Sequence, residues 1–546
     1  MTVRQLGGQY ATVVDLLHAA AQTNPEVEAY VERADPGSSG LLPAGPDGRR
    51  RMSFARWDEA AREMAEGFSA LGVKKGDVVC LLLPSSIDYA VCYLAAARLG
   101  AVTTGVNVRL GAREQAVITE RVRPVLTVVD TDVVAASARA PDTGRVVPRH
   151  ALTSIGGAGR ARRVALGPDD PVAIVWTSGS TGSPKGAVFA HRNLKAVAAG
   201  TDVLSRTGDR RLSPLPFAHV GYMTRVWDEI AHGITTVVTS HPWTAGEAIG
   251  LMKAERVTVG QGVPTQWALM LAHPALEASG LPDLRIAATG AARVPPELVR
   301  AMRGRLGCTV VVRYTSTETS LGTGTDPGDP DDVVATTVGR PVPGVELALV
   351  DDEARPAPHG TVGRVRLRSA AAMVGYVAAQ PSARLVDDEA TAQVRDASGW
   401  LTTGDLGWIG DDGNLRLAGR SSEMYIRGGY NVYPAEVEAV LGDHPGVAHV
   451  AVVGAPDPVL GEIGAAFAVL EPGTDRPGLQ ELRDTVRRQL ADYKAPDRLY
   501  VLDELPVTAV GKVDKRELAA RAAELEQRSV LDRQSMTAQT KVQVSR

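Results

Sequence analysis

Short apolar runs alternate with longer helical segments through most of the chain. DVVCLLLP (77–84) and VLTVVD (125–130) are apolar and have the length of buried strands. Between them, YAVCYLAAARLGA (89–101) has the length of a helix, and Gly100 is placed to end it. This alternation predicts an α/β fold built from layered subdomains with parallel strands.

A different pattern begins near Gly419. YPAEVEAVLGDHPGV (433–447) and LQELRDTVRRQL (479–490) predict helices, whereas VAHVAVVGAPD (447–457), GAAFAVLEPG (464–473) and RLYVLDELP (498–506) predict strands. We therefore expect a large N-terminal domain over residues 1–418 and a small α+β domain over 419–525. The polar residues 526–546 predict a flexible tail.

Composition narrows the classes of function. Lys and Arg total 59 and Asp and Glu total 63, so the net charge of −4 gives no argument for nucleic acid as a partner. Cys80, Cys92 and Cys308 fit neither a zinc site nor a disulfide framework, which favours structural thiols in a reducing cytoplasm. The longest apolar candidate, AAAMVGYVAA (370–379), is too short to span a bilayer, so no integral membrane association is expected.

Candidate chemistry begins with the loop TSGSTGSPKG (177–186). It is not a P-loop, because Lys185 follows Pro184 instead of Gly, and the apolar runs PVAIVW (171–176) and AVFA (187–190) on either side predict strands. Small residues in such a loop can turn backbone N–H groups toward an anion, with Lys185 adding a point charge. The nest-forming residues are Thr177, Ser178, Gly179, Ser180, Thr181 and Gly182. A flexible Gly/Ser hairpin is the alternative, which this unbroken series disfavours.

The loop resembles the phosphate-binding signature of the adenylate-forming enzymes, the superfamily of acyl-CoA synthetases, peptide-synthetase adenylation domains and luciferases. Four further segments resemble that superfamily's motifs in its order: YTSTET (314–319), WLTTGDLGWIGDDGNLRLAGR (400–420), GGYNVYPAEVE (428–438) and LPVTAVGKVDKREL (505–518). The chain is identified as a member of this superfamily, with a large adenylation domain and a small mobile domain.

The resemblance implies a reaction in two halves. A carboxylate attacks the α-phosphate of ATP to give acyl-AMP and pyrophosphate, and a nucleophile, often the thiol of CoA, then displaces AMP. ATP, Mg²⁺ and CoA are therefore implied. The resemblance assigns Glu318 and Thr317 to Mg²⁺ and phosphate, and Tyr314 to adenine. A surface Thr-Glu pair is the alternative for Thr317 and Glu318.

The remaining motifs, from residue 400 onward, carry further implied roles. Asp405 would bind the ribose, with an Asx-turn residue as the alternative, and Arg420 would support the ribose or a phosphate. Lys512 would neutralise charge between the carboxylate and the α-phosphate. Its alternative is a solvated lysine, which is how we interpret Lys515. Gly428 and Gly429 would border the tunnel for the pantetheine of CoA.

The acyl pocket is implied by segments that precede these motifs. His219 matches a gate residue beside the pocket, with a half-buried histidine as the alternative, and Val220 argues against an α-amino acid substrate because it lacks a carboxylate. Gly290, Ala291 and Ala292 would lie against adenine and the acyl chain. The expected pocket residues are His219, Val220, Met223, Gly262, Gly290 and Thr315.

The apolar character of the pocket is suggested by four apolar or aromatic side chains, although core packing explains them equally well: Tyr222, Met223, Val226 and Trp267. Arg225 could meet a polar substituent or face solvent.

Three positions depart from the superfamily's pattern. Thr315 stands where Gly is common, Arg364 where Glu is frequent, and Ser422 where Asp or Lys is usual. The hinge for closure and rotation of the small domain is expected near Ser421 and Ser422.

The leading hypothesis is an ATP-dependent acid–CoA ligase for a hydrophobic fatty or aryl acid, and the low aromatic content favours a medium or long acyl chain. One alternative passes the activated group to a carrier-protein thiol, an amine or another nucleophile. Another is a non-catalytic nucleotide-binding relative, which the joint presence of Lys185, Glu318, Asp405 and Lys512 disfavours. Monomer and homodimer stay open.

Overall fold

The computed structural model describes residues 8–34, 40–130, 144–157, 164–177, 184–277, 280–291, 294–379, 385–428, 430–457, 459–508 and 512–526. The chain divides into two compact units. The large unit comprises Met1–Ala348, Arg366–Thr403 and Gly410–Arg416, and the small unit comprises Leu349–Val365, Gly404–Ile409 and Leu417–Arg546.

The first sheet of the large unit contains nine strands. Its order is β15 (Arg340–Pro341), β14 (Thr323–Gly324), β13 (Thr309–Tyr314), β12 (Ile286–Gly290), β11 (Val259–Gly262), β9 (Arg210–Ser213), β10 (Thr235–Val238), β1 (Glu28–Arg33) and β2 (Arg49–Ser53). The pairs from β13 through β12, β11, β9 and β10 to β1 are parallel. Their carboxyl ends therefore meet at one edge of the sheet, where open α/β sheets bind ligands.

A second sheet of eight strands lies in the same unit. Its order is β19 (Val386–Asp387), β18 (Gly375–Val377), β8 (Lys185–Ala190), β7 (Pro171–Thr177), β4 (Val102–Gly105), β3 (Val78–Leu82), β5 (Leu126–Val129) and β6 (Arg145–Pro148). Strands β7 and β8 are antiparallel, with Thr177 opposite Lys185. The expected strand-to-strand geometry of the phosphate loop is thus confirmed.

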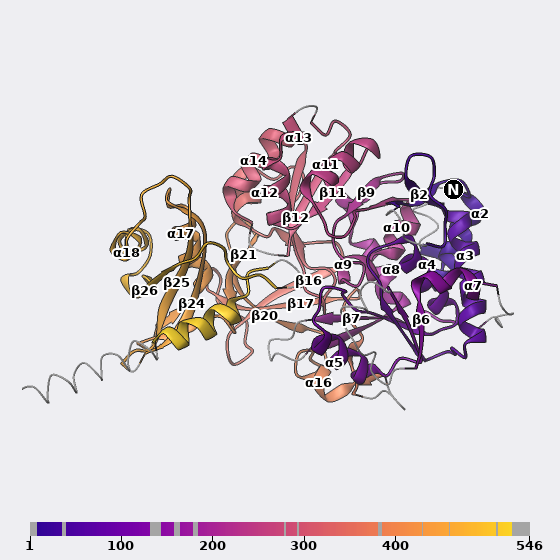
Figure 1. Cartoon of the computed structure of the whole chain (residues 1–546). Coiled ribbons are helices and arrows are strands. Elements are labelled where there is room, and N and C mark those ends of the chain that lie inside the picture. The colour runs from indigo at the N-terminus through magenta and orange to yellow at the C-terminus, as the bar shows by residue number, and fades with distance from the viewer. Residues whose placement is uncertain are drawn as a thin grey trace, which may run out of the picture. The chain divides into compact units, whose positions relative to one another are not determined.

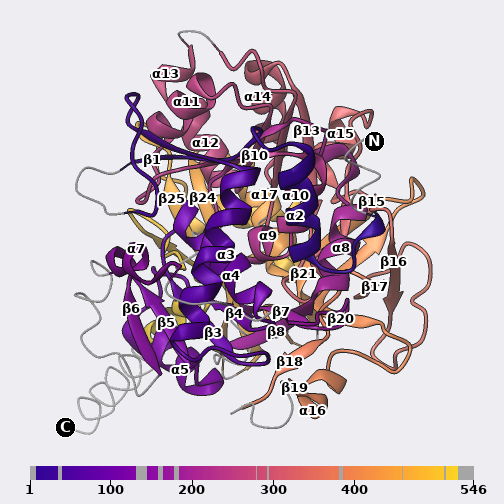
Figure 2. The same ribbon diagram turned by 90° about the vertical axis from the view of Figure 1, so that its right-hand side faces the viewer.

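Helices cover both sheets of the large unit. They are α2 (Val13–Thr23), α3 (Phe54–Ala70), α4 (Ile87–Arg98), α5 (Ala112–Val122), α7 (Leu152–Ile155), α8 (His191–Ala199), α9 (Val220–Met223), α10 (Val226–His232), α11 (Ala245–Ala254), α12 (Pro264–Ala272), α13 (Pro274–Glu277), α14 (Pro296–Leu306), α15 (Asp331–Thr336) and α16 (Asp388–Ala392). Figure 2 shows α2, α3 and α4 packed side by side. One hydrophobic core joins these helices and α10 to residues of both sheets, and another lies between the nine-stranded sheet and α11, α12 and α14, which Figure 1 shows grouped together.

Helix α3 illustrates why the sequence folds locally as it does. Ser53 accepts a hydrogen bond from the backbone N–H of Arg56 and so caps the helix, as serine does at many helix starts. Apolar residues recur along one stripe, which is buried, while the charged residues of α3 lie outside it. Within that stripe Trp57 donates its indole N–H to the carbonyl of Ala90 at 3.1 Å, joining α3 to α4.

A third sheet has the order β16 (Val345–Val350), β17 (Gly363–Ser369), β20 (Leu401–Ile409) and β21 (Leu415–Arg420), and the chain passes from one unit to the other within these strands. The small unit has its own sheet of β23 (Tyr430–Val432), β22 (Tyr425–Arg427), β25 (Gly461–Leu470) and β24 (Val447–Asp457), with β26 (Arg498–Val501) parallel to β25. Helices α17 (Pro434–Gly442) and α18 (Leu479–Arg487) pack on one face of it, and a helix over 515–526 contributes to the core on the other.

The predicted fold class is confirmed: a large α/β unit with parallel strands accompanies a small α+β unit. Cys80 and Cys92 are fully buried, and burial raises the pKa of each thiol. Within the described part of the chain, no helix has both the length and the apolar character needed to cross a membrane.

Candidate functional site

The phosphate loop leaves the second sheet between β7 and β8. Thr177 and Lys185 are cross-strand partners at its base, while Ser178, Gly179, Ser180, Thr181 and Gly182 lie outside the described residues. A Cβ atom at Gly186 would lie 2.8 Å from side-chain carbons of Ile174 and Val377, so only glycine fits after Lys185. Lys185 is half-buried, and its Nζ lies 5.2 Å from the ring centroid of Tyr376.

Tyr376 links Lys185 to Glu318. Its hydroxyl donates a hydrogen bond to Oε1 of Glu318 at 2.9 Å, and the backbone N–H of Met373 donates to the carbonyl of Glu318 at 2.8 Å. Only 5% of Tyr376 is exposed, and burial first and the Glu318 charge second raise the pKa of its phenol far above the usual value. The hydroxyl therefore stays protonated and orients the half-buried Glu318 carboxylate.

Tyr376 is the site residue that sequence reasoning missed. It lies in AAAMVGYVAA, an apolar run that is too short to span a bilayer. A polar tyrosine in an otherwise apolar run was the available signal, since a buried phenol requires a hydrogen-bond partner.

Strand β13 ends at Tyr314, and the loop that follows carries Thr315, Thr317 and Glu318. Its turn is closed by reciprocal bonds between Ser316 and Thr319, where each side chain accepts the other's backbone N–H at 3.2 Å. Thr315 is exposed, and its hydroxyl donates to the carbonyl of Ser316 at 3.2 Å. Tyr314 is buried, with its hydroxyl 3.3 Å from Oγ1 of Thr403, and Thr317 is half-buried.

Gly262, Gly290 and Tyr314 are the last residues of the neighbouring parallel strands β11, β12 and β13. The fold therefore brings these three predicted residues to one sheet edge. A Cβ at Gly290 would lie 2.1 Å from the carbonyl oxygen of Arg313, which excludes any side chain there. Ala291 follows with φ of 63°, a left-handed conformation that is strained for a residue with a Cβ. Ala292 lies outside the described residues.

His219 caps the short helix α9 and accepts a hydrogen bond from the backbone N–H of Gly221 at 3.2 Å. Val220 is 7% exposed, and Met223 is fully buried in the core between the sheets.

The remaining apolar candidates are also buried in cores. Tyr222 and Val226 belong to the same core as Met223, and Tyr222 stacks on Phe217 at 3.6 Å between ring centroids. Trp267 belongs to the core beneath α12 and donates to the carbonyl of Ala288 at 3.0 Å. Of the two explanations left open for these side chains, core packing accounts for their positions.

A second group of predicted residues belongs to the small unit. Asp405 is buried and pairs with Nε of Arg420 at 3.2 Å. The pKa of Lys512 is lowered, first by loss of hydration and then by the Arg420 charge, while Asp405 and Glu423 act in the opposite direction. The exposed Lys512 therefore lies within electrostatic range of Asp405 and Arg420.

Lys515 does not match its interpretation as a solvated lysine. Its Nζ lies 2.9 Å from Glu423 and 2.8 Å from Glu438, and its side chain is only 20% exposed. Loss of hydration would lower the pKa of Lys515, but the two carboxylates outweigh it and raise the pKa. Lys515 is thus a structural ion-pair residue beside the turn that follows β21.

The other predicted positions of the small unit lie in turns and strands. Ser421 and Ser422 belong to the turn between β21 and β22, where the Ser421 N–H donates to the carbonyl of Gly404 at 2.9 Å. Gly428 has φ of 58°, and Gly429 is outside the described residues. Arg364 pairs with Asp352 at 2.8 Å on the surface, which accounts for its charge.

The donor set suits a magnesium ion held mainly by a substrate. Among the described residues, no group of three or more His, Cys, Asp or Glu side chains is arranged to hold a metal alone. Glu318 offers one oriented carboxylate beside the hydroxyl-bearing Thr317. Mg²⁺ commonly takes one or two carboxylates and completes its shell with phosphate and water.

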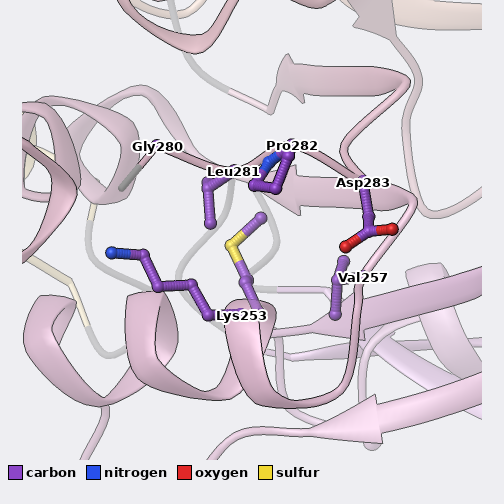
Figure 3. Close-up of a pocket in the computed structure, with 7 residues that line it drawn as sticks. Lys253, Val257, Gly280, Leu281, Pro282 and Asp283 are labelled. Atoms are coloured by element: carbon purple, nitrogen blue, oxygen red, sulfur yellow. The ribbon is translucent and has the colours of Figure 1, made fainter. Parts of the chain in front are cut away.

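The cavity in Figure 3 lies elsewhere. It has a volume of about 150 Å³ and is lined by Met252, Lys253, Val257, Gly280, Leu281, Pro282 and Asp283. None of these residues belongs to the predicted site, and Lys253 already donates to the carbonyl of Ala275 at 2.6 Å.

Two family models match separate parts of the chain. The family model described as AMP-binding enzyme matches residues 17–377, and that described as AMP-binding enzyme C-terminal domain matches residues 436–512.

Individual relatives cover most of the chain. A 3-[(3aS,4S,7aS)-7a-methyl-1,5-dioxo-octahydro-1H-inden-4-yl]propanoyl:CoA ligase of Mycobacterium tuberculosis is 38% identical, over 86% of this chain and 94% of that protein. A fatty acid–[acyl-carrier-protein] ligase of Streptomyces coeruleorubidus is 31% identical, over 93% and 98%. The solved structure of an anthranilate CoA ligase with anthranoyl-AMP is similar with a TM-score of 0.81 and 26% identity, over 95% and 98%.

Proposed function

The chain belongs to the AMP-binding enzyme family, and we propose that it uses ATP to join a hydrophobic carboxylic acid to CoA. The superfamily inferred from its motifs is thereby confirmed, and AMP-forming acyl-CoA synthesis is the activity that its relatives support. ATP and CoA are its co-substrates, and acyl-CoA, AMP and pyrophosphate are its products.

One observation carries this proposal: Tyr376 joins Lys185 to Glu318. Lys185 and the small residues of its loop bind the β- and γ-phosphates, because a point charge and backbone N–H groups suit an anion. Glu318 and Thr317 hold Mg²⁺, which when bound neutralises phosphate charge. Tyr376 fixes the Glu318 carboxylate, so little reorganisation is needed when ATP arrives.

The small unit supplies the other nucleotide contacts. Asp405 accepts hydrogen bonds from the ribose hydroxyls, and Arg420, its ion-pair partner, supports the ribose or a phosphate. Lys512 neutralises the charge that builds up as the carboxylate attacks the α-phosphate. Residues 1–418 act as the adenylation domain and 419–525 as its mobile partner, with Gly428 and Gly429 bordering the pantetheine tunnel.

The acid lies beside His219 and Val220. Adenine and the start of the acyl chain lie along Gly290, Ala291 and Ala292, and Tyr314 packs on the adenine. Gly262 and Thr315 complete the pocket. Because Val220 offers no carboxylate for an ammonium group, the substrate is not an α-amino acid.

A second candidate function differs only in the acceptor. The Streptomyces relative is a ligase for acyl carrier protein, so a carrier-protein thiol is the alternative to CoA. In both functions the protein works in the cytoplasm, and whether it works as a monomer or a homodimer does not alter the chemistry.

The test is a mass-spectrometric assay of the purified protein with ATP, Mg²⁺ and a panel of fatty and aryl acids, with and without CoA. We expect AMP and acyl-CoA together. Glu318→Gln should lose pyrophosphate release, whereas Glu297→Gln, which changes an exposed glutamate of α14, should retain it. Accumulation of acyl-AMP without CoA consumption would favour the carrier protein, and no pyrophosphate with any acid would leave only a nucleotide-binding role.

A further inference from the structure

One face of the nine-stranded sheet carries small and charged residues toward the strand ends. Paired residues of neighbouring strands share a face, and the register pairs Arg211 with Val259, Gln261 with Ala288, and Gly290 with Arg313. Since Val259 and Gln261 are two residues apart, as are Ala288 and Gly290, all these side chains lie on one face. Between the two arginines, β11 presents Val259 and Gln261 there, and β12 presents the small residues Ala288 and Gly290.

Arg225 lies over this face. It immediately precedes α10, whose Asp228 binds Arg211 at 3.1 Å, so α10 covers the same side of the sheet. Burial first, and the charge of Arg211 second, lower the pKa of Arg225 to about 10, and Arg313 acts in the same direction. Strands β11 and β12 separate β9 from β13, so the two arginines that lower the pKa of Arg225 flank these middle strands.

No residue that the structure describes accepts a hydrogen bond from the Arg225 guanidinium. Among the described residues, no oxygen lies within hydrogen-bond or ion-pair distance of it, although Asp228 and Glu229 act on it through space. The side chain is half-buried, and none of its nitrogens is among the fully buried polar atoms, so the guanidinium remains open to water and to a ligand. A charged guanidinium whose donors are not engaged by the protein can bind an oxygen supplied from outside the chain.

Asp228 is already engaged by other donors. It accepts from Thr201 at 2.7 Å, Ser205 at 2.8 Å and Arg211 at 3.1 Å, and it lies 3.0 Å from Nδ1 of His232. The carboxylate therefore has little capacity left for Arg225.

Glu229 does not balance the charge either. Burial is the main cause that raises its pKa to about 7, so it is partly protonated at neutral pH. It also lies 3.8 Å from Arg211 and accepts from the Tyr30 hydroxyl at 3.5 Å. Positive charge is consequently in excess around Arg225.

We propose that Arg225 determines substrate specificity by donating hydrogen bonds to a ketone or carboxylate oxygen carried by the acid on its skeleton, away from its reacting carboxyl group. This deepens the proposed function and rests on it, because the pocket formed by His219, Gly262 and Gly290 is the acyl pocket of that function. The substrate class thus narrows from hydrophobic acids to hydrophobic acids with a distal oxygen.

The experiment compares decanoate, 9-oxodecanoate and decanedioate in kcat/KM for acid-dependent pyrophosphate release. We expect the wild-type enzyme to favour at least one oxygenated acid by about 10- to 100-fold, a range reasonable for hydrogen bonds from a charged donor. Arg225→Met should abolish that preference while leaving kcat/KM for decanoate unchanged or higher. The preferred probe distinguishes a ketone from a carboxylate as the bound group.

Control variants distinguish this proposal from the proposed acid–CoA ligase activity on which it rests. Arg206→Met makes the same change at an exposed arginine and should retain the wild-type preference. Arg225→Lys keeps the charge and should retain part of the preference for the oxygenated acid. If Arg225→Met melts at a lower temperature than the wild-type enzyme, Arg225→Gln replaces it. Equal use of the three acids by wild type, or a preference unchanged by loss of Arg225, would overturn the proposal. Absence of pyrophosphate release with every acid would instead overturn the proposed function.

Discussion

The structure predicts that one buried histidine makes the protein sensitive to acid. His191, the first residue of α8, is 1% exposed, and its Nδ1 accepts a hydrogen bond from the backbone N–H of Val13 at 3.3 Å. Burial lowers the pKa of His191 to about 4, against the opposing charges of Asp170 and Asp15. The folded protein therefore keeps this imidazole neutral where the unfolded chain protonates it.

The sign and size follow from proton linkage. A group whose pKa is lower in the folded state contributes its full stability above the unfolded pKa, near 6.5, and loses it as the pH falls toward the folded value. At about 1.36 kcal/mol per pKa unit, the free energy of unfolding should fall by about 2 kcal/mol between pH 7 and pH 5, and by about 3 kcal/mol near pH 4.

The assay measures urea unfolding at pH 7 and pH 5 for wild type and His191→Asn, whose side-chain oxygen can replace Nδ1 as acceptor. We expect wild type to lose about 2 kcal/mol more than the variant over this interval. His18→Asn removes a histidine with a 59% exposed side chain and should follow wild type. Parallel pH curves for wild type and His191→Asn would refute the reasoning.

Three further predictions concern the site and its support. Tyr376→Phe removes the hydrogen bond to Glu318. Such a bond to a charged acceptor contributes about 1.5–3 kcal/mol at full burial and less at this half-buried carboxylate. Calorimetry should therefore show that Mg·ATP binds about 3- to 30-fold more weakly, whereas the affinity for ATP alone changes little. Asp228→Ala leaves Arg211 buried without its main partner and should lower the urea unfolding free energy by about 3–5 kcal/mol; a loss below 1 kcal/mol would contradict this. Lys512→Ala should abolish acyl-AMP formation but spare thioester formation from supplied acyl-AMP, and equal loss of both half-reactions would contradict its role.

Local elements were predictable because hydrophobic periodicity is a local property. The run 447–457 coincides with β24, and 77–84 contains β3. The helix expected over 89–101 begins earlier, at Ile87, because Ser86 caps it by accepting the N–H of Tyr89. The strand-to-strand loop was also predictable, since the apolar runs on either side are too short for helices.

Only site residues that belong to sequence motifs were predictable. Tyr376 carries no motif signal, and its importance comes from the pairing of β18 beside β8, which brings it to Glu318 across 58 residues of sequence. Lys512 and Lys515 are both lysines of the same segment, so the residue type alone does not distinguish their environments. The structure shows that Lys515 pairs with Glu423 and Glu438.

The sequence by itself determined the order of strands and helices, the loop around Lys185 and the family, because each depends on residues close together in the chain. Only the tertiary structure decided which ionisable groups are buried and which are paired. Arg225 shows the difference: its sequence neighbours allowed both solvent and substrate. Burial lowers its pKa, and so do the charges of Arg211 and Arg313, which sheet pairing brings to the same face. Desolvation and charge act through space, so neither can be known until the chain has folded.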